Sequence, residues 1–490
     1  MGQEKRYIAA DLGAESGRVM LGVVSDEKLV LEEVHRFRNV PIEEGGSLRW
    51  DFDMLLGEVK AGISKAVKEA KGKVAGIGID TWGAGMGFID SKGQLIENPY
   101  HYRDGGTEGM IEKAFGFMPK REIYEQTGIQ FMQFNDLYRL LEMRLSGSER
   151  LARAKHVIFM ADLFSYHLCG EIYGEYTIVS TSQMVDMKKG RWSEDVFEKL
   201  DLPIEKMPKI VKAGTIVGRL TKETAAELGC GQIPVIAVGS HDTACAVAAV
   251  PAEGERWAYL SSGTWSLIGV EVPDAIINDM TFEYQLTNEG GVDNTIRLLK
   301  NVMGLWLVQE CKRQWGREGV ELSYGELAEK AEKAEVFAGH IDVNCPEFFA
   351  PGDMVTGINN YLRRTGQKEI DDKGQLVRVI LESLAFKYRG VLDGIEEITG
   401  KPIEVLHIVG GGIKNELLCQ FTADATGRKV IAGPVEATAS GNILMQAKAT
   451  GQIESLGRIR EIVRNSFEFK SYEPQNRRLW QEQYKRIAET

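Results

Sequence analysis

The chain has 490 residues, and because one hydrophobic core rarely grows beyond about 250–300 residues, this length predicts two or three domains. Its 59 Lys and Arg against 71 Asp and Glu give a formal net charge of −12, which disfavours proteins that bind nucleic acid or an anionic membrane surface. No apolar run approaches the ~18–20 residues that span a bilayer, and the six cysteines lie far apart without a Cys-x-x-Cys pair. We therefore expect a cytoplasmic enzyme with neither a disulfide framework nor a zinc site.

Two kinds of segment alternate along the chain. Short β-rich segments that end in glycine or a small polar residue predict strands at residues 7–12, 74–79, 234–238, 257–260 and 405–409. Longer segments with apolar residues three and four apart predict helices at residues 54–70, 295–315 and 375–398. Strands that alternate with helices are typical of α/β proteins, and we expect mainly parallel sheets.

Two segments about half a chain apart share a pattern. Residues 8–22 and 259–269 each contain an apolar run, a turn of glycine with serine or threonine, and a second apolar run. The pattern predicts one β-hairpin in each half and indicates two related halves that meet at a ligand cleft. The alternative is that the two hairpins are unrelated, since any α/β protein can contain two of them.

Several common catalytic motifs are missing from the sequence. It contains no Gly-x-x-x-x-Gly-Lys-[Ser/Thr], which disfavours a P-loop nucleotidase, and no complete Gly-x-Gly-x-x-Gly, which disfavours a dinucleotide-binding enzyme. His-Glu-x-x-His and Gly-x-Ser-x-Gly are absent as well. Zinc hydrolysis and serine-ester chemistry therefore have no support from motifs.

The segment from Asp11 to Arg18 is the first candidate phosphate site. A turn with Ser16 and Gly17 allows backbone N–H groups and a hydroxyl to approach phosphate oxygens, and Arg18 adds a planar cation that suits phosphate. Asp11, at the end of a predicted strand, is a candidate ligand for hydrated Mg²⁺. The alternative is an ordinary hairpin with a surface arginine.

Asp242 is the candidate catalytic base. It follows the predicted strand at residues 234–238 and precedes a run of small residues, which places a carboxylate at the rim of a sheet where α/β proteins bind ligands. Phosphoryl transfer needs a positioned acceptor and one proton acceptor, so a single aspartate with Mg²⁺ is sufficient. The alternative is that Asp242 only caps a helix. His241 is either a substrate contact or a packed imidazole.

Three consecutive glycines follow the predicted strand at residues 405–409. Glycines 410–412 allow a flat or bulky group to lie on the backbone, and a helix is expected to follow from Asn415. The alternative is a tight left-handed turn. The cluster of Trp306, Leu307 and Trp315 indicates core packing and not a base-stacking platform.

Taken together, nine short motifs resemble those of the FGGY carbohydrate kinases along nearly the whole chain. The motifs are Asp11-Leu-Gly-Ala-Glu-Ser-Gly-Arg18, Asp80-Thr-Trp-Gly83, Tyr100-His-Tyr-Arg-Asp104, Thr127-Gly-Ile-Gln-Phe-Met132, Ser240-His-Asp-Thr243, Ser261-Ser-Gly-Thr-Trp-Ser266, Asn301-Val-Met-Gly-Leu-Trp306, Ala350-Pro-Gly-Asp353 and Gly410-Gly-Gly412. Each motif is weak alone, and their common order makes the resemblance strong.

The resemblance implies two ribonuclease-H-like domains, the fold of actin and hexokinase, with the ligands in the cleft between them. Residues 1–245 would carry the sugar site and the first phosphate loop, and residues 246–490 would bind the nucleotide. The implied activity is ATP-dependent phosphorylation of the C1 hydroxyl of a ketose. L-rhamnulose is the first choice, and L-fuculose, ribulose, xylulose or a polyol are alternatives. A regulator that binds sugar and ATP without transfer is a further alternative, and we expect a monomer or a homodimer.

The resemblance also implies roles for single residues. Asp242 would be the catalytic base, with Gly83, His241 and Thr243 at the sugar. The nucleotide and its phosphates would be bound by Ala14, Glu15, Ser16, Gly17, Arg18, Thr264, Asn301, Gln309 and Gly411.

Three positions depart from the family pattern. Gly85 stands where the motif after Asp80 usually has an aspartate, so a carboxylate is missing beside the implied sugar site. Gln133 replaces a usual proline, and Glu15 places a negative charge where a small hydroxyl residue is typical. A lost hydrogen-bonding carboxylate changes which sugar hydroxyls a buried site satisfies, so the identity of the sugar is the open point.

Overall fold

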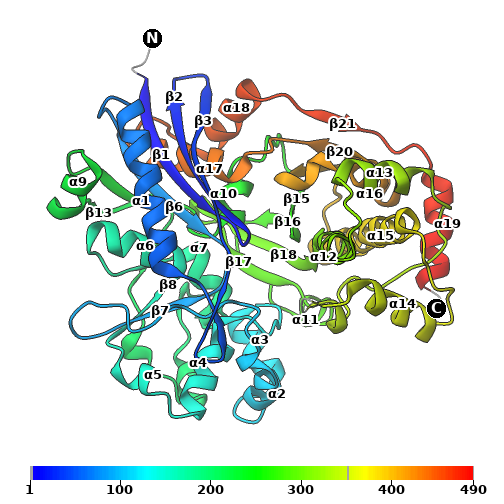
Figure 1. The fold of residues 1–490 in the computed structure, drawn as a ribbon, viewed down its shortest axis with the longest axis horizontal. Helices are drawn as coiled ribbons and strands as arrows, with labels where there is room; N and C mark the ends of the chain where they lie inside the picture. Colours follow the sequence, from blue (N-terminus) through cyan, green and yellow to red (C-terminus); the bar gives the residue numbers. More distant parts are fainter. Residues whose placement is uncertain (1–3, 350–351, 489–490) are drawn as a thin grey trace. The chain divides into compact units, whose positions relative to one another are not determined.

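The computed structural model of the protein describes residues 4–349 and 352–488 (Figure 1). The chain forms two compact units that interleave along the sequence. Unit 1 comprises the chain up to Pro251 together with Glu271–Leu298 and Ala437–Phe467, and unit 2 comprises Ala252–Val270, Leu299–Glu436 and the chain from Glu468 onward. The division into residues 1–245 and 246–490 stays a prediction. Ala350 and Pro351 of the expected Ala-Pro-Gly-Asp motif lie outside the described residues.

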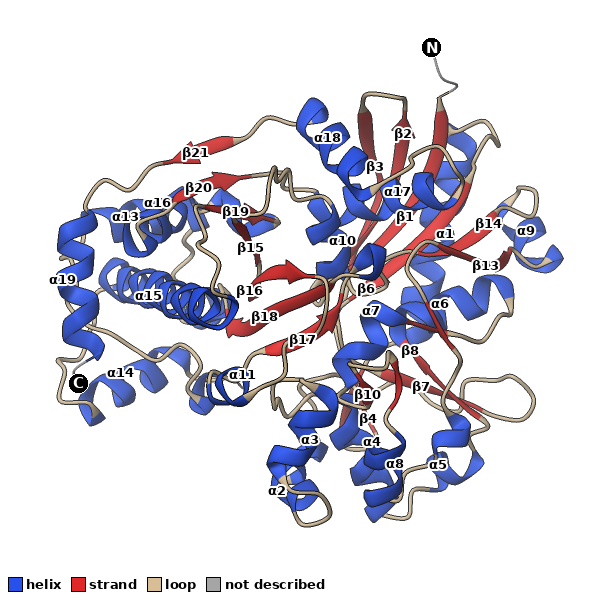
Figure 2. Ribbon diagram, turned by 180° about the vertical axis from the view of Figure 1, so that it is seen from behind, coloured by secondary structure: helices blue, strands red, loops and turns tan. Residues whose placement is uncertain are grey.

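Unit 1 is built on a six-stranded sheet with the order β13-β14-β6-β1-β2-β3 (Figure 2). The strands of unit 1 are β1 (Lys5–Leu12), β2 (Ser16–Val24), β3 (Leu29–Arg38), β4 (Ile42–Glu44), β5 (Ser47–Arg49), β6 (Gly76–Thr81), β7 (Met86–Ile89), β8 (His156–Phe159), β9 (Gly174–Glu175), β10 (Val185–Asp186), β11 (Arg191–Trp192), β12 (Ile210–Val211), β13 (Thr215–Arg219), β14 (Pro234–Ala237) and β17 (Thr287–Gly290). Its helices are α1 (Phe52–Glu69), α2 (Met110–Phe115), α3 (Lys120–Thr127), α4 (Asp136–Leu145), α5 (Glu149–Arg153), α6 (Met160–Cys169), α7 (Tyr176–Val179), α8 (Glu194–Lys199), α9 (Lys222–Leu228), α10 (Asp242–Ala248), α11 (Asp279–Glu283), α17 (Ala437–Ala449) and α18 (Leu456–Ser466).

Helices cover both faces of this sheet. α1 packs against β2 and β3, where its Gly62 lies against Val19. α17 packs against β1 and β6, and its Ile443 lies against Gly22 of β2. Because side chains alternate along a strand, positions 19 and 22 point to opposite faces, so α1 and α17 enclose the sheet between them. The ends of β1 and β6 are thereby held in a buried layer.

Unit 2 contains most of a seven-stranded sheet with the order β17-β18-β16-β15-β19-β20-β21. Its strands are β15 (Trp257–Ser262), β16 (Trp265–Val272), β18 (Ile296–Met303), β19 (Val405–Val409), β20 (Lys429–Ala432) and β21 (Lys470–Tyr472), of which β16 and β18 run across the boundary of the unit. Its helices are α12 (Trp306–Arg317), α13 (Tyr324–Lys333), α14 (Met354–Arg364), α15 (Lys373–Thr399), α16 (Glu416–Thr426) and α19 (Arg477–Ala488).

The two sheets share one topology, which confirms the repeated pattern seen in the sequence. In the first sheet a hairpin of β1 and β2 is extended by β3 on one side and by β6 and β14 on the other. In the second, the hairpin of β15 and β16 is extended by β18 and by β19 and β20 in the same order. Both predicted hairpins are therefore present, and they occupy equivalent places in the two sheets.

Two sequence predictions are wrong. The sheets are mixed and not mainly parallel, because the β1–β2, β2–β3 and β13–β14 pairs are antiparallel. The expected helix at residues 295–315 is a strand up to Met303 followed by α12 from Trp306. The apolar residues near the start of this segment are buried in a sheet, where their helix-like spacing is coincidental. The helices expected at residues 54–70 and 375–398 are confirmed as α1 and α15.

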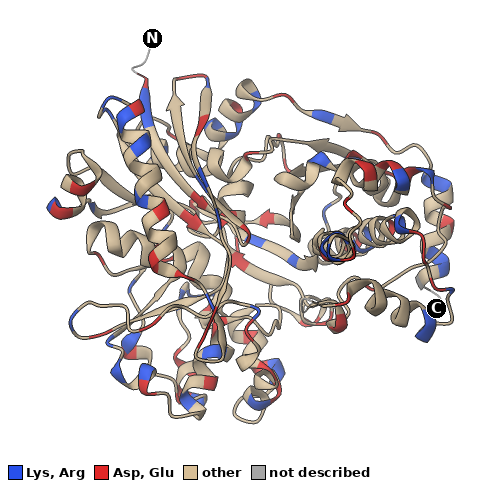
Figure 3. Ribbon diagram, viewed as in Figure 1, with Lys and Arg blue, Asp and Glu red and all other residues tan. Residues whose placement is uncertain are grey.

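Within residues 4–349 and 352–488, no helix is long and apolar enough to cross a membrane. Acidic and basic residues are interspersed along the helices of both units (Figure 3). Trp306, Leu307 and Trp315 are buried, which confirms that they pack in the core.

Candidate active site

Two aspartates lie opposite each other at the ends of the central strands of unit 1. The parallel register of β1 and β6 pairs Asp11 with Asp80, and both residues are buried. Burial raises the pKa of Asp80 well above its ordinary value, and the nearby charge of Asp11 raises it further. Two buried carboxylates so close together favour a cation or a proton between them.

Asp80 is held by side chains of α17, which packs on β6. The Asn442 side chain donates from Nδ2 to Oδ2 of Asp80 at 2.6 Å, and Gln446 donates to Oδ1 of Asn442 at 2.7 Å. The other oxygen of Asp80, Oδ1, is buried without a hydrogen-bond partner in the part of the chain that the structure describes. An acceptor of this kind is costly unless a ligand, water or ion satisfies it.

The hairpin between β1 and β2 contains the expected phosphate segment. Gly13 N–H donates to the Ser16 carbonyl at 3.0 Å, and a side chain at Gly17 would overlap the ring of Phe37. Arg18 donates from Nη2 to Oδ2 of Asp11 at 2.5 Å, and only 18% of its side chain is exposed. Arg18 is therefore not the surface arginine of the alternative interpretation.

Ala14 and Glu15 of this segment differ in exposure. Ala14 is half-buried, whereas the side chain of Glu15 is exposed. The backbone carbonyl of Glu15 accepts a bond from the Asn39 N–H at 3.0 Å. At this exposed position the carboxylate of Glu15 stays hydrated.

Asp242 is the first residue of α10, directly after the end of the sheet. His241 occupies the N-cap position without a side-chain capping bond, so the structure does not have the helix cap that was the alternative role of Asp242. The Thr243 hydroxyl donates to Oδ1 of Asp242 at 3.1 Å. About 30% of the Asp242 side chain is exposed, yet burial raises the pKa of its carboxyl; His241 opposes this shift, and Asp11 adds to it.

His241 is a packed imidazole that also faces Asp242. Its Nε2 lies 3.4 Å from Oδ1 of Asp242, and its Nδ1 lies 3.1 Å from Nη2 of the fully buried Arg297. Glu289 pairs with Arg297 at 3.2 Å and lies 3.4 Å from Nδ1 of His241. On the other side, a methyl group at Gly83 would lie 2.7 Å from Nε2. The absence of a side chain at Gly83 is what lets the ring occupy this place.

A set of buried polar groups fixes the backbone before Asp242. The Ser240 N–H donates to Glu175 at 3.0 Å, its hydroxyl donates to Asp162 at 3.2 Å, and the His241 N–H donates to the Thr177 hydroxyl at 3.2 Å. Burial raises the pKa of Glu175 to about 7 and that of Asp162 well above its ordinary value. These groups hold the 240–241 backbone in a single arrangement.

In unit 2, the turn that contains Thr264 packs against the start of α12. The Thr264 carbonyl accepts bonds from Gly304 N–H at 3.1 Å and Trp306 N–H at 3.2 Å. A side chain at Gly304 would lie within 2.8 Å of the Gly263 and Thr264 carbonyl oxygens. The close approach of this backbone explains the glycine in the Asn301–Trp306 motif.

The three glycines after β19 have two different roles. Added methyl groups at Gly410 and Gly412 would lie 3.0 and 2.0 Å from Ser262, whereas one at Gly411 would meet nothing within 4 Å. Packing on Ser262 therefore requires two of the glycines, and only Gly411 borders open space. The helix expected after the loop is confirmed as α16, which Asn415 caps through a 3.0 Å bond to Leu418 N–H.

The structure brings the predicted residues together in two groups. Asp11, Gly17, Arg18, Gly83, His241, Asp242 and Thr243 lie around the sheet ends of unit 1, and Thr264 and Gly411 both flank Ser262 in unit 2. Gln309, also in unit 2, buries an Oε1 with no partner among the described residues, and the Asn301 carbonyl accepts a bond from Asn344 at 3.4 Å. No group of three or more His, Cys, Asp or Glu in the described ranges forms a ready metal cage.

Several residues of the unit 1 group were missed in the sequence. Asp80 ends a strand as Asp11 does, so the strand-end pattern that singled out Asp11 applied to it as well. Asn442, Glu289 and Arg297 gave no signal, because they reach the site from segments far away in the chain.

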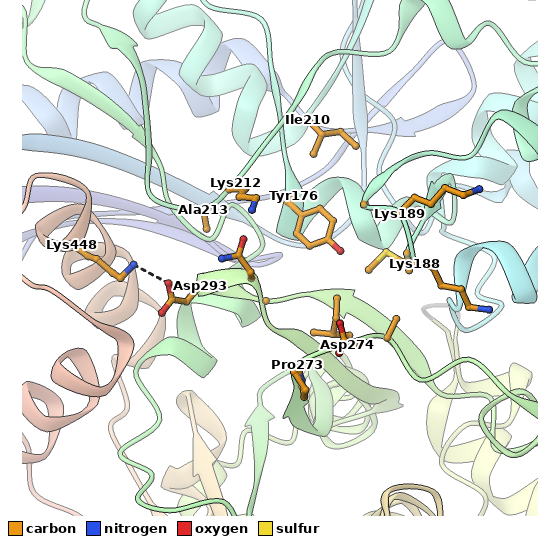
Figure 4. A pocket seen from close by; sticks show the side chains of 16 residues that line it. Tyr176, Lys188, Lys189, Ile210, Lys212, Ala213, Pro273, Asp274, Asp293 and Lys448 are labelled. Carbon is orange, nitrogen blue, oxygen red and sulfur yellow. Dashed lines mark hydrogen bonds and ion pairs between the residues drawn. The ribbon is translucent and has the colours of Figure 1, made fainter.

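A separate hollow of about 740 Å³ lies in unit 1 between β10, β12 and the β17–β18 turn (Figure 4). Its lining includes Tyr176, Lys212, Asp293 and Lys448, and Lys448 pairs with Asp293 at 2.9 Å. None of the residues predicted from the sequence lines it.

Comparisons with known proteins identify the family of the chain and agree with its fold. The models of the N-terminal and C-terminal domains of the FGGY family of carbohydrate kinases match residues 6–249 and 258–450. The chain is 43% identical to a rhamnulokinase of Bacteroides thetaiotaomicron over 98% of each chain. It is 39% identical to a rhamnulokinase of Bacillus subtilis over 96% of each chain.

Solved structures of low sequence identity show the same fold. A ligand-bound xylulose kinase from Lactobacillus acidophilus superposes with a TM-score of 0.82 at 18% identity, covering 99% of this chain and 97% of that one. A Plasmodium falciparum glycerol kinase with ADP superposes with a TM-score of 0.76 at 16% identity, covering 100% and 98%. The expected two-domain α/β kinase fold is therefore confirmed.

Proposed function

Because the chain belongs to the FGGY family of carbohydrate kinases, we propose that it transfers the γ-phosphoryl group of ATP to the C1 hydroxyl of L-rhamnulose. The observation that carries the proposal is the carboxylate of Asp242, fixed beside His241 and Thr243 in a chain whose full length is similar to proteins named rhamnulokinase. Sugar phosphorylation follows from the family, and the identity of the ketose is the new element.

Asp242 acts as the general base in this proposal. The C1 oxygen forms a bond to the γ-phosphorus as the bond from that phosphorus to the bridging oxygen of ADP breaks, and the hydroxyl proton passes to the Asp242 carboxylate. The raised pKa of Asp242 makes it a stronger proton acceptor than an exposed aspartate. His241, Thr243 and Gly83 would position the sugar.

Arg18 would offset charge on the phosphoryl oxygens, together with the backbone of Ala14, Glu15, Ser16 and Gly17. Thr264, Asn301, Gln309 and Gly411 of unit 2 would bind the nucleotide, with Gly411 offering the open backbone surface and Gln309 a buried acceptor. In this assignment, residues 1–245 bind the sugar and carry the first phosphate loop, and residues 246–490 bind the nucleotide.

The carboxylates of unit 1 fit a magnesium ion. Asp11, Asp80 and Asp242 interact electrostatically, and the orphaned Oδ1 of Asp80 is an acceptor that a hydrated cation satisfies. Mg²⁺ is commonly held by one or two carboxylates and substrate phosphates, so a complete protein cage is not required. Asp11 and Asp80 would hold the ion, which supplies charge neutralisation on the phosphates.

An ADP-release assay with MgATP tests the proposal across L-rhamnulose, L-fuculose, L- and D-ribulose, D-xylulose and glycerol. We expect L-rhamnulose to exceed the other acceptors by about 100-fold or more in kcat/KM. Preference for another ketose would replace the proposed substrate. ATP binding without phosphorylation of any acceptor would overturn the proposal in favour of a non-catalytic sugar and ATP binder.

A further inference from the structure

A carboxylate reaches Gly85 from a different part of the chain. Asp136, the first residue of α4, accepts a hydrogen bond from the Gly85 N–H through Oδ1 at 2.9 Å. At position 85, after the Asp80-Thr-Trp-Gly83 motif, the family usually has an aspartate, which this chain lacks. The carboxylate missing from the loop is thus present beside it, supplied by a helix 51 residues further along the chain.

Two buried polar atoms at this place have no partner in the described ranges. Oδ2 of Asp136 is an acceptor without a donor, although only 3% of the residue is exposed. Nε1 of Trp82 is a donor without an acceptor, and only 6% of that residue is exposed. Nε1 lies 3.8 Å from the point where a Cβ atom at Gly85 would stand. One orphaned acceptor and one orphaned donor therefore lie close to Gly85.

A small cavity lies on the Asp136 side of Gly85, beside the proposed sugar site. A cavity of about 20 Å³, lined in part by Gly85, His101, Phe134 and Asp136, has room for one water molecule or one hydroxyl group. Gly85 is two residues from Gly83, so their Cα atoms are at most ~7 Å apart. Gly83 in turn lies against the ring of His241. The cavity is accordingly within the reach of a sugar bound at His241.

We propose that Asp136 and Trp82 form a subsite that recognises one hydroxyl group of the ketose, remote from C1. The hydroxyl donates to Oδ2 of Asp136 and accepts from Nε1 of Trp82, which satisfies both orphaned atoms at once. This assignment rests on the proposed function, because it places the substrate at His241 and Asp242. It makes Asp136 a specificity-determining residue in place of a carboxylate at position 85.

The backbone explains why the carboxylate comes from α4. Gly85 has φ +115°, a conformation that residues with a side chain rarely adopt, and a Cβ atom there would lie 3.0 Å from Cγ of Met160. An aspartate at position 85 would be strained in this loop. A glycine at 85 together with an aspartate at 136 provides the charge without that strain.

Asp136→Asn and Trp82→Phe test the subsite, since each removes one orphaned group; the first keeps the shape of the side chain and the second keeps an aromatic ring. Initial rates are measured at pH 8 with L-rhamnulose and with analogues that lack a single hydroxyl at C3, C4 or C5. We expect either variant to lose about 10- to 100-fold in kcat/KM for the sugar, with the KM for ATP within about twofold of wild type.

The analogues identify the hydroxyl. For one deoxy analogue, the kcat/KM of wild type should be lower than for L-rhamnulose by the same factor. Asp136→Asn should show no further loss of kcat/KM with that analogue, because the substitution and the missing hydroxyl remove the same bond. Asp186→Asn is the matched control, since Asp186 is a buried carboxylate of unit 1 that bonds to the backbone N–H groups of Lys188 and Lys189. It should match wild type on every sugar.

The outcomes separate this inference from the proposed function. If wild type phosphorylates L-rhamnulose and both variants do so equally well, the subsite is wrong and the function stands. If both variants lose the same factor on all analogues, Asp136 and Trp82 serve the fold and not hydroxyl recognition, which also overturns the subsite. If wild type prefers another ketose, the proposed substrate is wrong, and the variants measured with that ketose decide the subsite.

Discussion

Nη2 of Arg297 lies 3.1 Å from Nδ1 of His241, and this contact fixes where the imidazole carries its proton. A guanidinium group only donates hydrogen bonds, so in a neutral ring this contact makes Nδ1 the acceptor and places the proton on Nε2, against the pull of the Glu289 carboxylate 3.4 Å from Nδ1. Nε2 faces Oδ1 of Asp242 at 3.4 Å. Arg297, which is fully buried, thus orients the donor that faces the proposed catalytic base.

Arg297→Met should therefore lower kcat by about 10- to 100-fold with a smaller change in the KM for ATP, because His241 loses the contact that sets its tautomer. ¹⁵N spectra of the imidazole should show the proton shared between both nitrogens in the variant and confined to Nε2 in wild type. Arg460→Met is the control, since Arg460 pairs with Glu271 elsewhere in unit 1. A variant that loses activity but keeps the wild-type tautomer would contradict the positioning role.

Asp242→Asn should fold as wild type does and lose at least about 100-fold in kcat, because an amide of the same shape cannot accept the hydroxyl proton. Thr243 can still donate to the amide oxygen, so the local structure is preserved. Single-turnover rates with ATP and the best ketose measure the chemical step. Turnover within tenfold of wild type would contradict the role of Asp242 as base.

Gly83→Ala should lower kcat/KM for the sugar, since its methyl group would lie 2.7 Å from Nε2 of His241 and force the ring to move. We expect a loss of about 10- to 100-fold. Gly231→Ala is the matched control, because a methyl group there meets nothing within 4 Å and the backbone has no positive φ. Equal activity of both variants would show that the ring position is unimportant.

Gly441→Ala should destabilise the protein by roughly 1–3 kcal/mol, because a methyl group on α17 would lie 1.9 Å from the carbonyl oxygen of Cys245 in α10. The backbone oxygen cannot turn away as a flexible side chain does. Gly57→Ala, in open space on α1, should instead stabilise by about 0.5–1 kcal/mol. Urea unfolding of both variants measures the difference, and a neutral Gly441→Ala would mean that the two helices separate easily.

Sequence reasoning was most successful for structural features that depend on local chain geometry. The hairpin with Arg18, the strand-to-helix junction before Asp242 and the glycine loop at 410–412 each lie within one short segment, so turn residues and strand ends revealed them. The helix expected at residues 295–315 was wrong over Ile296–Met303, because spacing alone does not separate a buried strand from a helix.

Contacts made by distant segments could not be predicted from one sequence. Asn442 reaches Asp80 across 362 positions, and Arg297 reaches His241 across 56. Gly85 shows this most clearly, because the sequence indicates a missing carboxylate whereas the fold supplies one from Asp136. A local departure from a motif is therefore not evidence of a lost interaction until the neighbours in space are known.

Asp136 should also make stability depend on pH. Burial raises the pKa of its carboxyl from 3.8 to about 7, although the Gly85 N–H and the charge of Arg139 oppose the shift. His101, which lines the same cavity, has a pKa lowered to about 3 by burial and stays neutral above pH 4. Between pH 4 and 7 the folded protein keeps a proton that the unfolded chain releases, so raising the pH favours unfolding.

The stabilisation from the protonated Asp136 carboxyl is complete below about pH 4 and is lost as the pH rises through about 7. Asp136→Asn removes this titration, so the free energy of unfolding of wild type minus that of the variant should fall by up to about 4 kcal/mol between pH 4 and 8. Urea unfolding at several pH values measures it. Trp82→Phe, which removes the other orphaned group near Gly85 and is not titratable, should give a difference that is flat with pH. A flat difference for Asp136→Asn as well would mean that the carboxyl is ionised throughout and already paired.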